Sequence, residues 1–272
     1  MKISISHIAW HRNQNKQIVE LLKKFNIDTI EVAPTMLFDN PLEVSDREID
    51  DVKAFWDDNG IKMHAMQSLL YNGENLALFK TEEMRQNMYH HLVKIIELAA
   101  KLDVKILVFG SPRNRLIVIY DNVKKIAKKF FTEIAEVAKE FNILFCIEPN
   151  AQAYDCNFIT NVDQAIALVK YIDHPNFKMM FDLSTVIANQ DIVSAEIQKA
   201  LPHMKHCHIS EPFLKPIIDR QHTHNEIAAC LHKNNYSGAV SIEINTNKID
   251  NNLILIENSL EIVTGHYKKI IL

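Results

Sequence analysis

The stretch Leu144-Phe145-Cys146-Ile147-Glu148-Pro149-Asn150 decides the fold. An apolar run ends abruptly in the carboxylate of Glu148, and Pro149 stops it. A parallel strand that is covered on both faces is almost continuously apolar, and a proline cannot donate to the ladder beyond it. The stretch therefore predicts a buried strand whose last inward-facing residue is a polar group at the mouth of a barrel.

Three later stretches end in the same way, in a carboxylate or an imidazole: Met179-Met180-Phe181-Asp182, Lys205-His206-Cys207-His208 and Val240-Ser241-Ile242-Glu243. Glu, Asp, His and Glu form a ligand set for a divalent metal. Side chains alternate along a strand, which puts Glu148, His208 and Glu243 on the same face as the residues two and four positions before them. Where such strand tips converge, the carboxylates repel one another unless a cation or protons intervene.

The composition of the chain limits the classes of protein to which it can belong. The 272 residues are 47% hydrophobic and 24% charged, with a net charge of −4. This balance provides no basic field for nucleic acid or an anionic membrane. No signal-peptide core or apolar run of about 20 residues is evident, and the four cysteines have no CxxC spacing. We expect a reducing, cytoplasmic location and no nucleic-acid or membrane partner. The sequence is compatible with a homo-oligomer and does not determine the oligomeric state.

Hydrophobic periodicity predicts eight strands that alternate with eight helices. The expected strands span residues 2–6, 27–32, 61–68, 104–109, 143–148, 177–182, 204–209 and 239–244. The expected helices span residues 14–25, 45–58, 81–101, 120–141, 161–172, 192–201, 221–235 and 253–268. This pattern predicts an α/β protein, a single (β/α)8 TIM barrel in one domain over residues 1–272. A doubly wound open sheet is the alternative. Only five glycines occur, so we expect Asn and Asp at some turns.

The chain resembles the sugar-phosphate isomerase/epimerase group of the xylose-isomerase-like barrels. The resemblance rests on Ile147-Glu148-Pro149-Asn150, Phe181-Asp182, His206-Cys207-His208-Ile209-Ser210-Glu211-Pro212, Ser241-Ile242-Glu243, Ile30-Glu31-Val32-Ala33-Pro34-Thr35, Met66-Gln67-Ser68 and Phe109-Gly110-Ser111-Pro112-Arg113-Asn114-Arg115. It covers nearly the whole chain. It implies one divalent metal held by Glu148, Asp182, His208 and Glu243, with Glu148 and Glu243 as the catalytic acid–base groups.

The chemistry that the resemblance implies is proton transfer through a metal-stabilised enediolate of a sugar or sugar phosphate. A metal that contacts a carbonyl and the neighbouring hydroxyl acidifies the adjacent C–H, and a carboxylate takes the proton. Return of a proton to the opposite side gives epimerisation, and return to the neighbouring carbon gives isomerisation. The mixed carboxylate–imidazole set suits Mn²⁺, Mg²⁺, Zn²⁺ or Co²⁺.

Two positions depart from the group's pattern. Thr185 stands where sugar epimerases often have a His, and Leu214 stands where they often have an Arg. Both departures argue against simple epimerisation of a free ketose. An inosose or polyol dehydratase on the same one-metal site is the nearest alternative. An abasic-site endonuclease would need further histidines where Gln67 and Gly110 stand, and a binding barrel without catalysis is the remaining class.

Five further residues are candidates for contact with the substrate. Arg113 and Arg115, in the loop after the fourth strand, suit a phosphate or carboxylate, unless they pair with nearby acids. Glu31 and Gln67 end the second and third strands and could hydrogen-bond a sugar hydroxyl or satisfy other polar groups. Glu211, after the seventh strand, faces either the substrate or an ion-pair partner.

Overall fold

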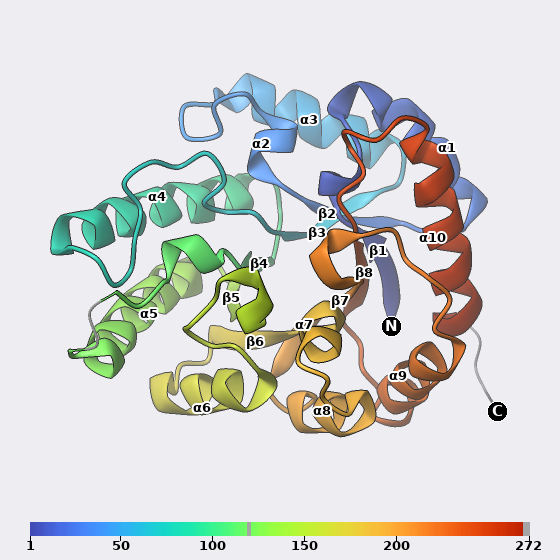
Figure 1. Ribbon diagram of the computed structural model, residues 1–272. Coiled ribbons are helices and arrows are strands. Elements are labelled where there is room, and N and C mark those ends of the chain that lie inside the picture. The colour runs from blue at the N-terminus through green and yellow to red at the C-terminus, as the bar shows by residue number, and fades with distance from the viewer. Residues whose placement is uncertain (119–120, 269–272) are drawn as a thin grey trace.

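Eight parallel strands form one sheet in a computed structural model that describes residues 1–118 and 121–268. Their bounds are β1 (Lys2–Ile5), β2 (Thr29–Val32), β3 (Lys62–Met66), β4 (Ile106–Phe109), β5 (Leu144–Ile147), β6 (Phe177–Asp182), β7 (Met204–Ser210) and β8 (Ala239–Glu243). The strand order β1-β8-β7-β6-β5-β4-β3-β2 places each strand beside its neighbour in sequence. The predicted (β/α)8 barrel is confirmed, with the strands ringed by helices in Figure 1.

The barrel closes where β1 meets β2. A parallel bridge joins Ser6 to Glu31 at the mouth. Lower down, the Thr29 hydroxyl donates to the Ile3 carbonyl across 2.8 Å. Because these contacts join the two ends of the strand order, the alternative of an open, doubly wound sheet is wrong.

Ten helices accompany the strands within the described part of the chain: α1 (Asn15–Lys24), α2 (Pro34–Leu37), α3 (Asp46–Asp58), α4 (Glu82–Lys101), α5 (Val123–Glu140), α6 (Val162–Ile172), α7 (Leu183–Ala188), α8 (Val193–Ala200), α9 (Gln221–Lys233) and α10 (Asn252–Tyr267). Eight of them match the predicted helices, although residue 120, the expected start of α5, lies outside the described residues. The short helices α2 and α7 were not predicted, since neither is long enough to show a period. None of the described helices has the length and apolar character needed to cross a membrane.

Asparagine and aspartate replace glycine at the turns, as expected. Their side chains tolerate the left-handed backbone conformation better than those of other non-glycine residues. Ten of them have positive φ: Asn26, Asn72, Asn75, Asp103, Asn122, Asn142, Asp155, Asp173, Asn235 and Asn251. Several directly follow helices, including Asn26 after α1 and Asn142 after α5, where a left-handed residue ends a helix.

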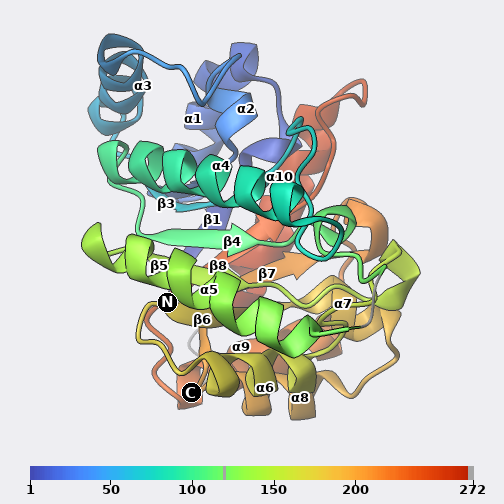
Figure 2. The same cartoon turned by 90° about the vertical axis from the view of Figure 1, so that its left-hand side faces the viewer.

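On the side of the barrel formed by β3 to β6, the interior changes from apolar to polar along the strands. A small cluster fills its lower part: Ala65, Ile106, Val108, Cys146 and Met180. Two residues further along the same inward faces stand Glu148 after Cys146 and Asp182 after Met180. Since all the strands are parallel, their polar tips gather at one end, toward which β4 and β7 point in Figure 2. This end is the expected place of an active site in such a barrel.

Candidate metal centre and active site

The four sequence-predicted ligands meet at the carboxyl ends of neighbouring strands. Glu148 directly follows β5, Asp182 ends β6, His208 lies in β7 and Glu243 ends β8. One ligand atom from each lies within 4.8 Å of all the others. Opposite ligands of an octahedral Mg²⁺ are about 4.2 Å apart, twice a bond of about 2.1 Å. Small side-chain movements therefore suffice to place all four around one divalent ion.

His208 supplies an unsatisfied nitrogen to this cluster. Its Nδ1 has no hydrogen-bond partner, and it lies 3.4 Å from Glu148 Oε1 and 3.2 Å from Glu243 Oε2. The ring is fully buried, so water does not compensate this atom. Three carboxylates and an imidazole lone pair directed at one point fit a divalent cation, which would offset their mutual repulsion.

Asp182 is held in place by the start of α7. Its carboxylate accepts hydrogen bonds from the backbone N–H of Ser184 and of Thr185, at 3.3 and 2.9 Å, and from the Ser210 hydroxyl. Thr185 is buried and donates its hydroxyl to the Pro149 carbonyl across 2.9 Å. It therefore links the ends of β5 and β6.

The lack of a side chain at Gly110 leaves the space that the Glu148 carboxylate occupies. An added Cβ at Gly110 would lie 1.7 Å from Glu148 Oε2, far inside van der Waals contact. Glycine is thus required at the end of β4 because the carboxylate of the next strand occupies that space.

We expect Gly110→Ala to reduce turnover by about 100-fold and to weaken metal binding, because the methyl group displaces a reacting carboxylate by about 1 Å. Gly265→Ala is the matched control, since nothing lies within 4 Å of that added Cβ. Metal titration and turnover of both variants check this. Equal behaviour of the two variants would contradict the close packing of Gly110 against Glu148.

The electrostatic setting of the cluster is unusual for its side chains. Burial, together with the charge of Glu243, raises the pKa of Glu148 to about 7. Burial disfavours the charged imidazole of His208, yet Glu31 and Glu243 hold its pKa well above the usual value. Burial likewise disfavours ionised Glu31, but His208 and His206 hold its pKa below the usual range. Without a cation, Glu148 and His208 therefore retain protons near neutral pH.

We expect metal affinity to rise between pH 6 and 8. A divalent ion binds the deprotonated ligands, so it displaces the protons that the raised pKa values of Glu148 and His208 retain. For each proton that the ion displaces, the metal affinity rises about tenfold per pH unit as long as the pH lies below the pKa of that group. Calorimetric titration with Mn²⁺ in two buffers of different ionisation enthalpy measures the proton release. A pH-independent affinity over this range would contradict the assignment.

A cavity of about 670 Å³ opens above the cluster, a size typical of small-molecule sites. Glu148, Asp182 and Glu243 line it. Of the predicted substrate contacts, Gln67 and Arg113 also line it. Gln67 is held in place because its amide donates to the Ser6 hydroxyl across 2.6 Å.

Arg115 has a different place from the one expected. Its side chain is completely buried, outside the cavity lining. It donates to the Glu148 carbonyl across 2.7 Å and to the Asn150 side chain. Arg115 therefore supports the backbone that carries Glu148, and in this arrangement it cannot contact a substrate directly.

Glu31 and Glu211 also lie outside the cavity lining. Glu31 is fully buried below the cluster, against the rings of His206 and His208. Glu211 accepts hydrogen bonds from the guanidinium group of Arg220 at 2.9 to 3.1 Å. The structure therefore shows Glu211 in an ion pair, which was the alternative to substrate contact. Its carboxylate is buried. Both placements differ from the predicted contact with substrate.

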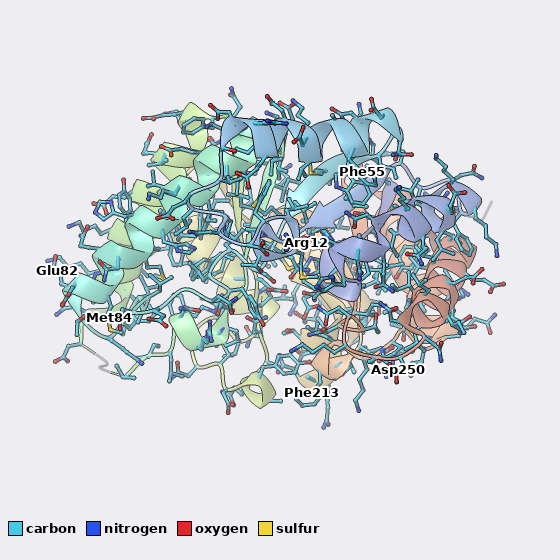
Figure 3. The ribbon with its side chains drawn as sticks, turned by 90° about the horizontal axis from the view of Figure 1, so that it is seen from above. Arg12, Phe55, Glu82, Met84, Phe213 and Asp250 are labelled. Carbon is cyan, nitrogen blue, oxygen red and sulfur yellow. The ribbon has the colours of Figure 1, made fainter. Side chains whose placement is uncertain are left out.

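Several cavity residues were not singled out from the sequence. Tyr154 and Phe213 line the mouth and pack edge to face with ring centroids 5.2 Å apart. Phe213 is 66% exposed and lies at the edge of the view in Figure 3. Phe213 and Leu214 both have left-handed backbone conformation, with φ of 63° and 54°, which is strained for bulky residues. Further lining residues are Asn150, Ser184, Asn245, Asn247 and Lys248. They come from loops and from short helical turns, such as α7 with Ser184, which are too short to show a period.

Comparison with known proteins agrees with this architecture. D-psicose 3-epimerase of Ruminiclostridium cellulolyticum is 25% identical over 254 residues, which cover 89% of this chain and 83% of that protein. The crystal structure of D-psicose 3-epimerase with D-tagatose from Clostridium cellulolyticum H10 superposes with a TM-score of 0.80 at 21% identity, over 98% of this chain and 99% of the other. The IolI protein with a bound zinc atom matches with a TM-score of 0.72 at 17% identity, over 99% and 100% of the two chains. The family model for the xylose isomerase-like TIM barrel matches residues 19–263, and the chain belongs to that family.

Proposed function

We propose that this protein is a divalent-metal-dependent sugar epimerase or isomerase that moves a proton on the carbon beside a carbonyl group. The observation that carries the proposal is the placement of Glu148 and Glu243. They stand at the carboxyl ends of strands β5 and β8, their carboxylate oxygens lie 3.4 and 3.2 Å from His208 Nδ1, and both residues line the cavity. The likeness to D-psicose 3-epimerase supports the same class of substrate, a ketose or its derivative.

Two carboxylates at one metal centre suit proton removal and return. A bound divalent cation supplies Lewis-acid polarisation of the substrate carbonyl. Glu148 and Glu243 then act as the general base and the general acid, one on each side of the carbon. Asp182 and His208, together with Glu148 and Glu243, hold the cation in this proposal.

Arg113 indicates which substrates to test. It lines the cavity together with Lys248, and both side chains are exposed. Within residues 1–118 and 121–268, neither belongs to an ion pair. A guanidinium group available at a cavity mouth suits a phosphate or carboxylate on the substrate. We therefore include phosphorylated sugars beside free ketoses.

We expect Arg113→Ala to raise KM for a phosphorylated ketose by roughly tenfold or more, because charge-assisted hydrogen bonds contribute about 1.5–3 kcal/mol. KM for the matching free ketose should change little. Arg47→Ala is the control, since Arg47 is exposed on α3 and does not line the cavity. Steady-state kinetics on both sugars measure the difference, and equal changes in the two KM values would rule out a role in anion recognition.

The proposed function is tested by incubating the metal-loaded protein with free and phosphorylated ketoses in D2O. Deuterium should enter the carbon beside the carbonyl, and a second epimer or an aldose should appear. Loss of water from the substrate would instead indicate the dehydratase. If a broad set of sugars shows neither exchange nor water loss, the chain is better described as a binding barrel.

A further inference from the structure

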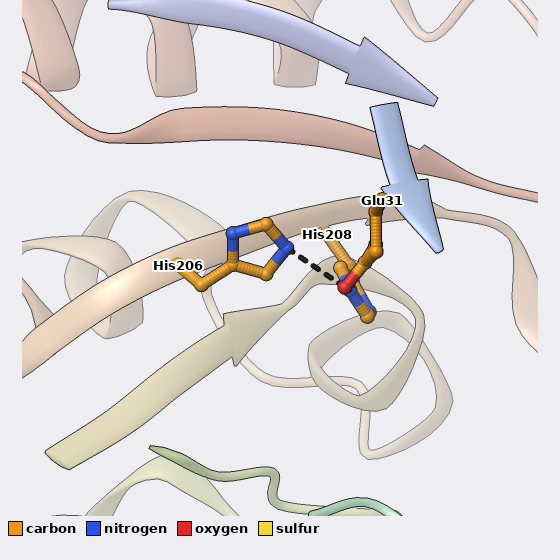
Figure 4. Close-up of side chains that lie close together, drawn as sticks. All are labelled: Glu31, His206 and His208. Atoms are coloured by element: carbon orange, nitrogen blue, oxygen red, sulfur yellow. Dashed lines mark hydrogen bonds and ion pairs between the residues drawn. The ribbon is translucent and has the colours of Figure 1, made fainter. Parts of the chain in front are cut away.

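Beneath the proposed metal centre, the carboxylate of Glu31 lies between two imidazole rings (Figure 4). His208 Nε2 is 3.1 Å from one Glu31 oxygen and 3.0 Å from the other. His206 Nε2 lies 3.1 Å from Oε1, and the Ser241 hydroxyl donates to Oε2 across 2.7 Å. All four side chains are completely buried. Glu31 is therefore occupied by protein donors and does not reach the cavity.

This contact determines which nitrogen of His208 carries the hydrogen. An ionised carboxylate only accepts hydrogen bonds, and a neutral imidazole has one N–H and one lone pair. With Nε2–H donated to Glu31, the lone pair must be on Nδ1, the atom that faces Glu148 and Glu243. Only the lone pair binds a metal.

We propose that Glu31 is a positioning residue of the metal centre. By accepting the Nε2–H of His208, it holds the imidazole in the tautomer and ring orientation that aim the Nδ1 lone pair at the cation. This inference rests on the metal centre proposed above. It assigns Glu31 to the metal site, in place of the substrate contact expected from the sequence.

His206 completes the arrangement. Its ring packs edge to face against His208, with centroids 5.1 Å apart and planes at 83°. Glu31 thus touches groups on both sides, which restricts rotation of its carboxylate. The same three side chains could form a second metal site, because their ligand atoms also lie within 4.8 Å of one another. However, the Nε2 atom of His208 is already hydrogen-bonded to Glu31 and so does not offer a lone pair to a second ion. We therefore expect one ion per chain.

The test compares Zn²⁺ and Mn²⁺ binding by the wild-type protein and Glu31→Gln. Glutamine keeps the shape, but its NH2 group can donate to the Nε2 lone pair and so favour the opposite tautomer. We expect Kd to rise 10- to 100-fold, the usual effect of losing a partner of a metal-bound histidine. Glu196→Gln is the matched control, because Glu196 is a buried carboxylate that pairs with Lys199 on α8, outside the cavity lining.

The tautomer is read directly by NMR of ¹⁵N-histidine-labelled, zinc-loaded protein. The histidine whose Nδ1 shifts on zinc addition should carry its hydrogen on Nε2 in the wild type. Glu31→Gln should lose or shift that Nε2–H signal. Wild-type affinity in Glu31→Gln, or an Nδ1–H on His208 in the zinc-loaded wild type, would overturn the proposal. If the variant does not fold, the wild-type tautomer alone decides.

These measurements need no substrate. If no sugar shows exchange but Glu31→Gln weakens zinc binding, the proposed activity fails and the role of Glu31 stands. If sugars do exchange but Glu31→Gln binds metal as the wild type does, only the role of Glu31 fails. A wild-type protein that binds no divalent ion overturns both.

Discussion

Glu148→Gln should lower kcat by about 10²- to 10⁴-fold, the usual contribution of a general acid or base. Glu243→Gln should have an effect of the same order. Glutamine keeps the size and a ligand oxygen of the side chain but cannot accept the substrate proton. The two carboxylates stand at the ends of different strands, β5 and β8, so we expect each to serve its own side of the carbon and neither to replace the other.

Deuterium exchange separates the roles of the two groups. With one carboxylate intact, the protein should still exchange the proton of the one epimer that faces it, without forming the other epimer. The two variants should therefore retain exchange on opposite epimers. If both lose exchange on the same epimer, a single-base isomerase explains the site better. Glu196→Gln again serves as the control for a buried carboxylate.

Removal of divalent ions with a chelator should abolish turnover and lower the melting temperature. A ligand at 100 times its Kd stabilises the folded state by about 2.7 kcal/mol. For a chain of this size, losing that stabilisation lowers the melting temperature by roughly 5–10 °C. The physical reason is the repulsion among Glu148, Asp182 and Glu243, whose ligand atoms gather within 4.8 Å. Thermal unfolding with and without added Mn²⁺ measures it.

Asp182→Asn provides the control for this experiment. It removes one charge from the cluster and should reduce the shift that Mn²⁺ causes. Because its NH2 group cannot accept the hydrogen bonds that Asp182 receives from Ser184, Thr185 and Ser210, the Mn²⁺ shift is measured against the chelated form of the same variant. A shift of the same size in Asp182→Asn would mean that the metal binds elsewhere in the protein.

The barrel and the meeting of the four candidate ligands could be predicted because both follow from the pattern of the strands. Each of the strands β5 to β8 carries a polar residue on its inward face at or near its carboxyl end. Parallel strands bring these ends to the same edge. Glu148, Asp182, His208 and Glu243 therefore meet without any information from loops.

Depth within the barrel could not be predicted in the same way. Alternation places Glu31 on the inward face of β2 but does not say how far its tip lies below the mouth. The register between β2 and β3 shifts between Ile30 and Glu31, and such a shift has no sequence signal. Glu31 consequently meets His206 and His208 instead of the cavity.

The placement of loop residues could not be predicted from the sequence either. Arg113 and Arg115 are two positions apart, yet one lines the cavity and the other is buried. Their loop forms a short 3₁₀ turn, Pro112–Asn114, whose orientation depends on distant partners such as Asn150. Glu211 likewise pairs with Arg220, nine residues away. Composition alone does not reveal such pairings.

The position of the metal tests the central claim most directly. Anomalous diffraction from crystals grown with Mn²⁺ should show one peak per chain, bounded by Glu148, Asp182, His208 Nδ1 and Glu243. The absence of a peak there, or a peak between Glu31, His206 and His208 instead, would contradict the account.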